Sequence, residues 1–213
     1  MIQTEPLKNA LILADDRAEL IKRGKSLEYF TIGWNSLEAV VAISFGSIAG
    51  SVALFGFGVD SVIESSSGAI VLWRLFAGEE RERLALRLVG ISLLLLAAYV
   101  AFDAVKSLIF QERPDESYVG IGLAFVSLIV MPILAREKRK VATRLNSRAM
   151  QADSKQTDIC AYLSAILLGG LLLNALVGWW WADPIAALVM IPIIAKEGIE
   201  ALQGKTCCGG ECH

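Results

Sequence analysis

The chain has 213 residues, of which 55% are hydrophobic, and its mean hydropathy is +0.55. Soluble domains are typically about 45–50% apolar even when glycine is counted. The hydrophobic content of 55% in this chain does not include its 18 glycines. The formal net charge of −2 argues against a nucleic-acid-binding protein, which needs a basic surface. The composition therefore predicts an integral membrane protein with no nucleic-acid partner.

Residues 1–28 are polar and of mixed charge, with no short apolar core followed by a cleavage site of small residues. This pattern does not predict a signal peptide. We expect a cytoplasmic leader, which is either a helix at the membrane interface or a partly ordered segment.

Six apolar segments follow, each long enough to cross a hydrocarbon core of about 30 Å, which needs about 20 helical residues. They cover approximately residues 29–49, 51–75, 84–110, 117–135, 151–177 and 180–201. In lipid only helices satisfy every backbone group within one segment, and the chain lacks the alternating strands of a barrel. The predicted fold is all-α: a polytopic membrane domain over residues 29–201 with six transmembrane helices.

Basic residues are concentrated in alternate connections between these segments. The positive-inside rule places such connections in the cytoplasm, so both termini are predicted to be cytoplasmic. The basic positions are Lys22, Arg23 and Lys25, then Arg74, Arg81, Arg83 and Arg87, and then the run 136–148, which we interpret as the connection between the fourth and fifth helices.

The second segment carries two acids inside its apolar run. Asp60 and Glu64 are four residues apart, so they share one helix face, roughly 14 and 20 Å from the outer surface. Acids within a membrane are usually functional, which favours a cation or proton pathway. The alternative is a structural network of hydrogen bonds between helices.

The fifth segment carries a second polar face. Asp153, Gln156 and Cys160 are spaced i, i+3, i+7, and Cys160 lies near the middle of the membrane. Asp60, Glu64, Gln156 and Cys160 therefore predict four donors from two facing helices, as a tetrahedral cation site requires. A lone buried cysteine is also commonly just a small apolar residue.

Two further acids of this segment are weaker candidates for the metal site. Asp153 has a second interpretation, as a carboxylate favoured at the amino terminus of a helix. Asp158 lies about 200° around the helix from Gln156 and Cys160. We expect it to face a water-filled path or a polar neighbour such as Asn35 or Glu38.

The last residues, 202–213, form a cysteine-rich tail. Clustered cysteine and histidine commonly bind metal, so the tail predicts capture and transfer of a metal ion on the reducing side of the membrane. The alternative is a disordered end of the chain. The candidate ligands are Cys207, Cys208, Cys212 and His213.

The chain resembles the cation diffusion facilitator family of divalent-metal/proton antiporters. The resemblance rests on EYFTIGWNSLEAVVAISFGSIAGSVALFGFGVDSVIESSSG and RAMQADSKQTDICAYLS. It implies that Asp60 and Glu64 are metal ligands, and it places Gln156 at the family's histidine position and Cys160 at its second acid position. Both substitutions depart from the family pattern. Glutamine offers a neutral oxygen, and a thiolate prefers softer ions.

The resemblance implies export of a heavy divalent metal, zinc or cadmium above all, by proton antiport with alternating access. It also implies a bacterial inner-membrane location and possible homodimers, with no enzyme activity and no cofactor beyond the transported ion. The family's usual carboxy-terminal cytoplasmic domain, which supports dimers, has no expected counterpart here. The alternatives are a metal sensor or accessory subunit that does not transport, and a transporter of a non-metal cation.

Overall fold

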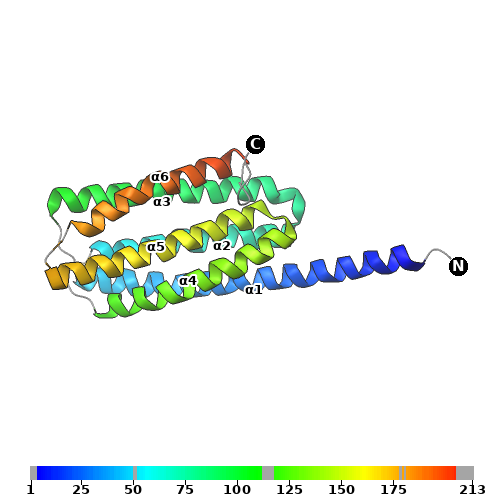
Figure 1. Cartoon of the computed structure of the whole chain (residues 1–213), viewed down its shortest axis with the longest axis horizontal. Coiled ribbons are helices and arrows are strands. Elements are labelled where there is room, and N and C mark those ends of the chain that lie inside the picture. Colours follow the sequence, from blue (N-terminus) through cyan, green and yellow to red (C-terminus); the bar gives the residue numbers. More distant parts are fainter. Residues whose placement is uncertain (1–3, 50–51, 112–117, 178, 180, 205–213) are drawn as a thin grey trace.

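The computed structural model describes residues 4–49, 52–111, 118–177, 179 and 181–204, and this part of the chain folds into six α-helices. Figure 1 shows them lying side by side in an elongated bundle. The all-α prediction of six helices is confirmed. The helices are α1 (Thr4–Ala49), α2 (Val52–Ala77), α3 (Glu82–Phe110), α4 (Tyr118–Leu145), α5 (Arg148–Val177) and α6 (Ala182–Leu202), with one 3₁₀ turn (Glu79–Arg81) before α3.

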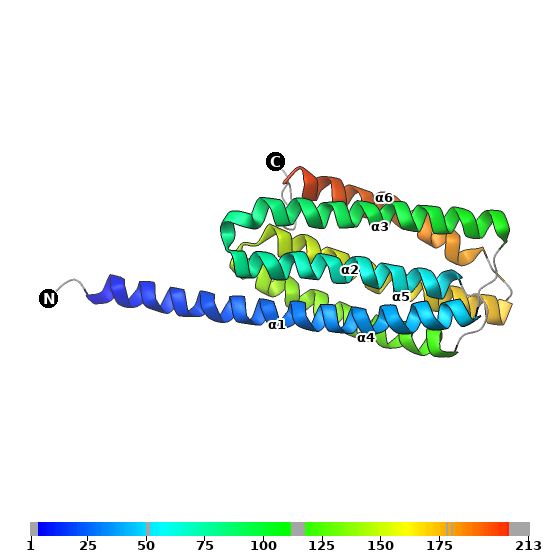
Figure 2. The same ribbon diagram turned by 180° about the vertical axis from the view of Figure 1, so that it is seen from behind.

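The helices form three layers, with α2 and α5 in the middle (Figures 1 and 2). The most extensive contacts join α1 to α2, α3 to α6, and α4 to α5. In addition, α2 contacts α3 and α5, while α5 contacts α3 and α6. The two helices that carry the predicted metal ligands are therefore the two that other helices cover on most sides.

Polarity is distributed as a lipid environment requires. Large apolar side chains such as Ile48, Phe102 and Val189 are exposed, whereas many acids and hydroxyl groups are buried. Within the described residues, two regions are long and apolar enough to span a membrane by hydropathy alone, Glu79–Phe110 and Tyr118–Leu145. The acids Asp60 and Glu64 lower the mean hydropathy of α2, although both side chains face the interior.

The predicted leader is part of the first helix. α1 has 46 residues and is about 70 Å long at 1.5 Å per residue, which exceeds the roughly 30 Å hydrocarbon core. Its amino-terminal end projects beyond the bundle (Figure 1), whereas Leu20 and Ile21 already pack against other helices. The start of α1 and the end of α6 lie toward this same end of the molecule; the compartment that this end faces stays a prediction.

The basic run 136–148 differs from its interpretation as a connection. It is helical as far as Leu145, and the turn to α5 is confined to the next two residues, where Asn146 adopts a φ of 52°. The helix continues because Ala135, Lys138, Ala142 and Leu145 recur at three- and four-residue spacing and are all buried. This extension carries a lysine into the interior of the bundle.

The contact between α3 and α6 depends on two glycines. A Cβ atom on Gly90 would lie 3.0 Å from the carbonyl oxygen of Gly198 and 3.1 Å from the backbone nitrogen of Leu202. Backbone atoms cannot rotate out of the way as a flexible side chain can. We therefore expect Gly90→Leu to separate α3 from α6 and to lower stability by about 1–3 kcal/mol, as overpacking typically does.

The thermal unfolding midpoint of the purified protein in detergent measures this effect. Gly122→Leu is the matched control, because a Cβ there meets nothing within 4 Å. Equal midpoints for the two variants would contradict the packing argument.

Candidate metal site

The predicted ligands lie on the inner faces of the two central helices. Asp60 is 2% exposed, and Glu64, Gln156 and Cys160 are fully buried. The Cys160 thiol is unbridged and faces both the Asp60 and the Glu64 carboxyl groups. Cys160 of α5 thus meets the α2 pair inside the bundle, whereas Gln156 is buried on α5 one turn away from Cys160.

This region contains polar atoms without partners. Among the described residues, no carboxylate oxygen of Asp60 or Glu64 has a hydrogen bond of normal geometry, although the Cys160 thiol is close to both groups and the Thr157 hydroxyl is close to Glu64. Both amide atoms of Gln156 are also without a partner. Burying a polar group without a hydrogen bond is unfavourable, and burying an isolated charge is far more so. The region therefore requires a cation, protons or water to complete it.

The side chains of the predicted ligands on α2 and α5 do not converge on one point in the structure. Within the described part of the chain, no group of three or more His, Cys, Asp or Glu side chains is placed so that it could hold a metal ion. The structure brings the two helix faces together, and convergence of the four side chains on one ion stays a prediction.

The two weaker candidates have partners within the protein. Asp153 is fully buried and accepts hydrogen bonds from Lys138 Nζ (2.5 Å) and from Ser67 Oγ (2.6 Å). Asp158 is partly exposed and forms an ion pair with Arg139 of α4. Of the two alternatives expected for Asp158, a water-filled path or a polar neighbour, the structure shows a polar neighbour, which is Arg139 rather than Asn35 or Glu38. Both carboxylates differ from Asp60 and Glu64 in having a basic partner.

A polar stripe along α1 completes the buried polar interior. Glu28, Thr31, Asn35 and Glu38 are all fully buried, and Glu38 accepts a hydrogen bond from Ser61 of α2 (3.4 Å). These residues follow one helix face at three- and four-residue spacing. That spacing is visible in the sequence and could have identified Glu28 as an interior residue rather than part of a polar leader.

One glutamate fixes the start of α5. Glu82 of α3 accepts hydrogen bonds from the backbone nitrogen of Ala149 (2.7 Å) and from Ser147 Oγ (3.2 Å), and it forms an ion pair with the buried Arg74 of α2. These contacts satisfy a free N–H group at the amino terminus of α5. They also join α2, α3 and α5 at one end of the bundle.

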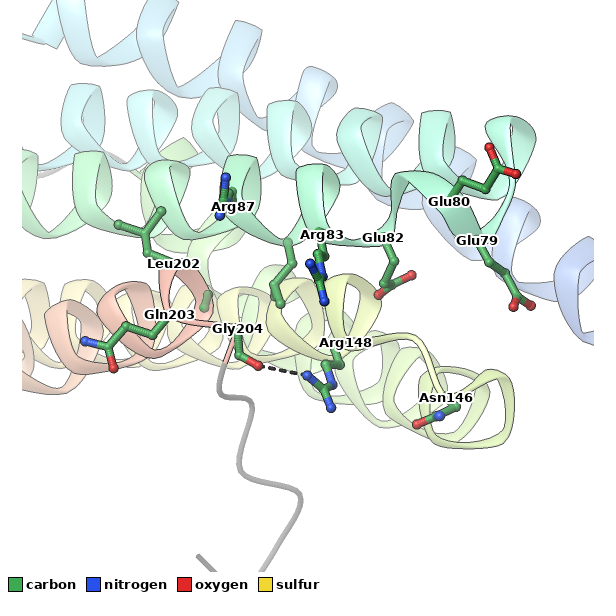
Figure 3. A pocket seen from close by; sticks show the side chains of 12 residues that line it. Glu79, Glu80, Glu82, Arg83, Arg87, Asn146, Arg148, Leu202, Gln203 and Gly204 are labelled. Atoms are coloured by element: carbon green, nitrogen blue, oxygen red, sulfur yellow. Dashed lines mark hydrogen bonds between the residues drawn. The ribbon is translucent and has the colours of Figure 1, made fainter.

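A separate pocket of about 580 Å³ opens at this end, and Figure 3 shows the side chains around it. Arg148 donates a hydrogen bond to the carbonyl of Gly204 there (2.9 Å). The predicted tail ligands Cys207, Cys208, Cys212 and His213 follow Gly204 and lie outside the described residues. The pocket is lined by Glu79, Glu80, Glu82, Arg83, Leu86, Arg87, Asn146, Arg148, Ala201, Leu202, Gln203 and Gly204.

The chain is similar to known membrane transport proteins. A family model described as "Cation efflux transmembrane domain" matches residues 29–203. An uncharacterised transporter of Synechocystis sp. is 25% identical over 174 residues, which cover 75% of this chain and 56% of that protein. The chain is shorter than this relative and the two described next.

Two other relatives are named for the metals that they transport. A cadmium, cobalt and zinc/H(+)-K(+) antiporter of Bacillus velezensis is 26% identical over 131 residues, or 59% of this chain and 40% of that protein. The manganese efflux system protein MneP of Bacillus subtilis is 27% identical over 182 residues, or 76% of this chain and 60% of that protein.

The Glu82 contacts yield a stability prediction. Glu82→Ala leaves Arg74 buried without its carboxylate partner and the first turn of α5 without its acceptor. We expect a loss of about 2–3 kcal/mol in the free energy of unfolding, because an unpaired buried charge is added to lost hydrogen bonds. Unfolding in detergent, followed by circular dichroism, measures it.

Glu80→Ala is the control, since Glu80 is exposed two residues earlier in the chain. If Glu82→Ala and Glu80→Ala were equally stable, Glu82 would have no role in holding α5.

Proposed function

The chain belongs to the cation efflux (cation diffusion facilitator) family, and from this membership we propose that it exports a heavy divalent metal ion from the cytoplasm in exchange for protons. Zinc and cadmium are the proposed ions. The family transports cations, which agrees with the expectation that the chain is not an enzyme.

The observation that carries the proposal is the pair of unpartnered carboxylates on α2. Asp60 and Glu64 are buried, and none of their oxygens has a hydrogen bond of normal geometry within the described residues. The donor and basic groups that interact with them are the Cys160 thiol and, for Glu64, also Thr157 and the charge of Lys138. When ionised, the two carboxylates supply two negative charges, which match one divalent cation. A merely structural network would instead pair these oxygens with donors from neighbouring helices.

The proposed exchange follows from the chemistry of these ligands. Metal binding requires the ligands to be deprotonated, so protons arriving from outside displace the ion from Asp60 and Glu64. The chain has one histidine, His213, which lies in the tail. The carboxylates or the thiol therefore carry the coupling protons. Rocking of the bundle exposes the site to each side in turn.

Gln156 and Cys160 set the choice of metal in this proposal. The relatives' names specify cadmium, cobalt and zinc in one case and manganese in the other. A thiolate favours softer ions over manganese, and the glutamine oxygen adds a neutral ligand. This chemistry supports cadmium and zinc ahead of manganese.

Several other expectations belong to the proposal as well. We place Asp153 and Asp158 outside the transport site, because each has a basic partner. Capture of metal by Cys207, Cys208, Cys212 and His213, a homodimer and a bacterial inner-membrane location are further parts of the proposal.

Removal of one α2 charge tests the site. We expect Asp60→Asn to lower proton-driven metal accumulation in everted vesicles by on the order of 100-fold, since even outer-shell substitutions cost about 10–100-fold in affinity or activity. Asp158→Asn is the control, because it alters a partly exposed ion pair of little energetic value.

Full activity of Asp60→Asn would refute the site assignment. Metal binding by the wild-type chain without net movement into vesicles would instead support the alternative of a metal sensor or accessory subunit.

Replacement of the thiol tests metal selection. We expect Cys160→Asp to lower the ratio of cadmium to manganese transport by on the order of tenfold, because a carboxylate is a harder ligand than a thiolate. Competition between the two ions in the same vesicles measures the ratio. Cys160→Ser separates loss of sulfur from gain of charge, and an unchanged ratio in both variants would remove Cys160 from the ligand set.

A further inference from the structure

A fully buried lysine joins four helices beside the proposed metal site. The Nζ atom of Lys138 in α4 lies 2.5 Å from Asp153 Oδ2 of α5 and 3.1 Å from Glu28 Oε2 of α1. The other oxygen of Asp153 accepts a hydrogen bond from Ser67 of α2 (2.6 Å). Thr157 Oγ1 is 3.4 Å from the same ammonium nitrogen.

The charges of the cluster formed by Lys138, Glu28 and Asp153 do not balance when both acids are ionised. One ammonium group lies between two carboxylates, and all three side chains are fully buried. Among the described residues, the Lys138 ammonium is the one donor group that pairs with Glu28. With both acids ionised, the cluster carries an excess negative charge in an interior where such charge is unfavourable.

The donors around the ammonium are those of a cation site. The ammonium contacts two carboxylates and the Thr157 hydroxyl, and such oxygen ligands suit hard divalent ions such as Mn²⁺ or Mg²⁺. Ser67 holds the other oxygen of Asp153. Because one nitrogen atom contacts both carboxylates, a single cation placed there contacts both as well. The ammonium thus stands where a divalent ion would bind.

The cluster lies between the proposed transport site and one end of the bundle. Ser67 is three residues beyond Glu64 on α2, and Asp153 precedes Cys160 by seven residues on α5, about 10 Å along the helix. Both displacements lead toward the end at which α4 turns into α5. This is the end that the predicted orientation assigns to the cytoplasm.

Displacement of the ammonium requires the Lys138 side chain to swing out of the interior while α4 stays helical. A lysine has a flexible four-carbon stem that commonly carries its charge to a polar surface.

We propose that Glu28 and Asp153 form a second divalent-cation site, on the route from the cytoplasmic end to Asp60 and Glu64. The Lys138 ammonium is its resident cation, and an arriving metal ion displaces it. The position of this site on a transport route rests on the proposed function, whereas its capacity to bind a cation does not. The oxygen ligands of this second site bind divalent ions with little distinction between metals. Cys160 in the transport site then favours the softer ions among them.

Equilibrium binding of Mn²⁺ to the purified full-length protein in detergent tests the site. The background is Asp60→Asn with Glu64→Gln, which removes the carboxylates of the transport site, and Mn²⁺ is the probe because the tail thiols bind it poorly. Adding Lys138→Met, an uncharged side chain of similar length, should raise the Mn²⁺ affinity at least tenfold, with one ion bound per chain. Adding Asp153→Asn as well should abolish the gain.

Arg139→Met is the matched control, since it removes a neighbouring charge that pairs with the partly exposed Asp158. It should leave Mn²⁺ binding unchanged. The proposal is overturned if Lys138→Met folds and gains no Mn²⁺ binding, or if the gain persists with Asp153→Asn.

A charge-preserving variant covers the case in which Lys138→Met does not fold. Lys138→Arg keeps the pairing, and its planar guanidinium binds carboxylates more rigidly than an ammonium does. Metal should displace it less readily, so the KM for transport should rise at least threefold; an unchanged KM overturns the proposal. If the wild-type chain transports no metal, the proposed function fails, and Mn²⁺ binding still decides the second site.

Discussion

The structure depends on two buried carboxylates. Within the described residues, neither has a hydrogen bond of normal geometry. Asp60 and Glu64 lie on the middle layer of the bundle, where other helices exclude lipid and water from most sides. Such groups are tolerated only when a mobile cation, a proton or water completes them. A protein that keeps them in this state has an interior suited to exchanging one cation for another.

The rest of the interior contrasts with this pair. Asp153 is held by Lys138 and Ser67, Glu38 by Ser61, and Glu82 by Arg74 and the first turn of α5. These contacts link every helix of the middle layer to a neighbour. The paired charges therefore hold α2 and α5 in place, and the unpaired ones are left between them for a ligand.

The relatives indicate how such a scaffold can serve different ions. One is named for cadmium, cobalt and zinc and another for manganese, although each is about as similar to this chain as the other. Within the proposed site, Cys160 is the softest donor and Asp60 and Glu64 are the hard ones.

Much of this arrangement could be predicted from the sequence because it depends on local patterns. Long apolar runs specify helices in lipid, so the number of helices could be predicted, although α1 begins and α4 ends well outside the predicted segments. The four-residue spacing of Asp60 and Glu64 places both on one face of α2, and the matching spacing on α5 places Gln156 and Cys160 together. These are properties of a single helix, and they do not depend on what packs against it.

Only the tertiary structure decided which charges are paired. Lys138 stands in a run of basic residues that suggests a solvated connection, and Glu28 stands in a polar leader, yet both are fully buried against Asp153. Charge patterns along the chain could not reveal this, because the partners come from three helices up to 125 residues apart and meet only when α1, α4 and α5 pack. The same packing turned Asp158 toward Arg139. It left Asp60 and Glu64 outside the ion pairs of the described residues, although the charge of Lys138 acts on Glu64.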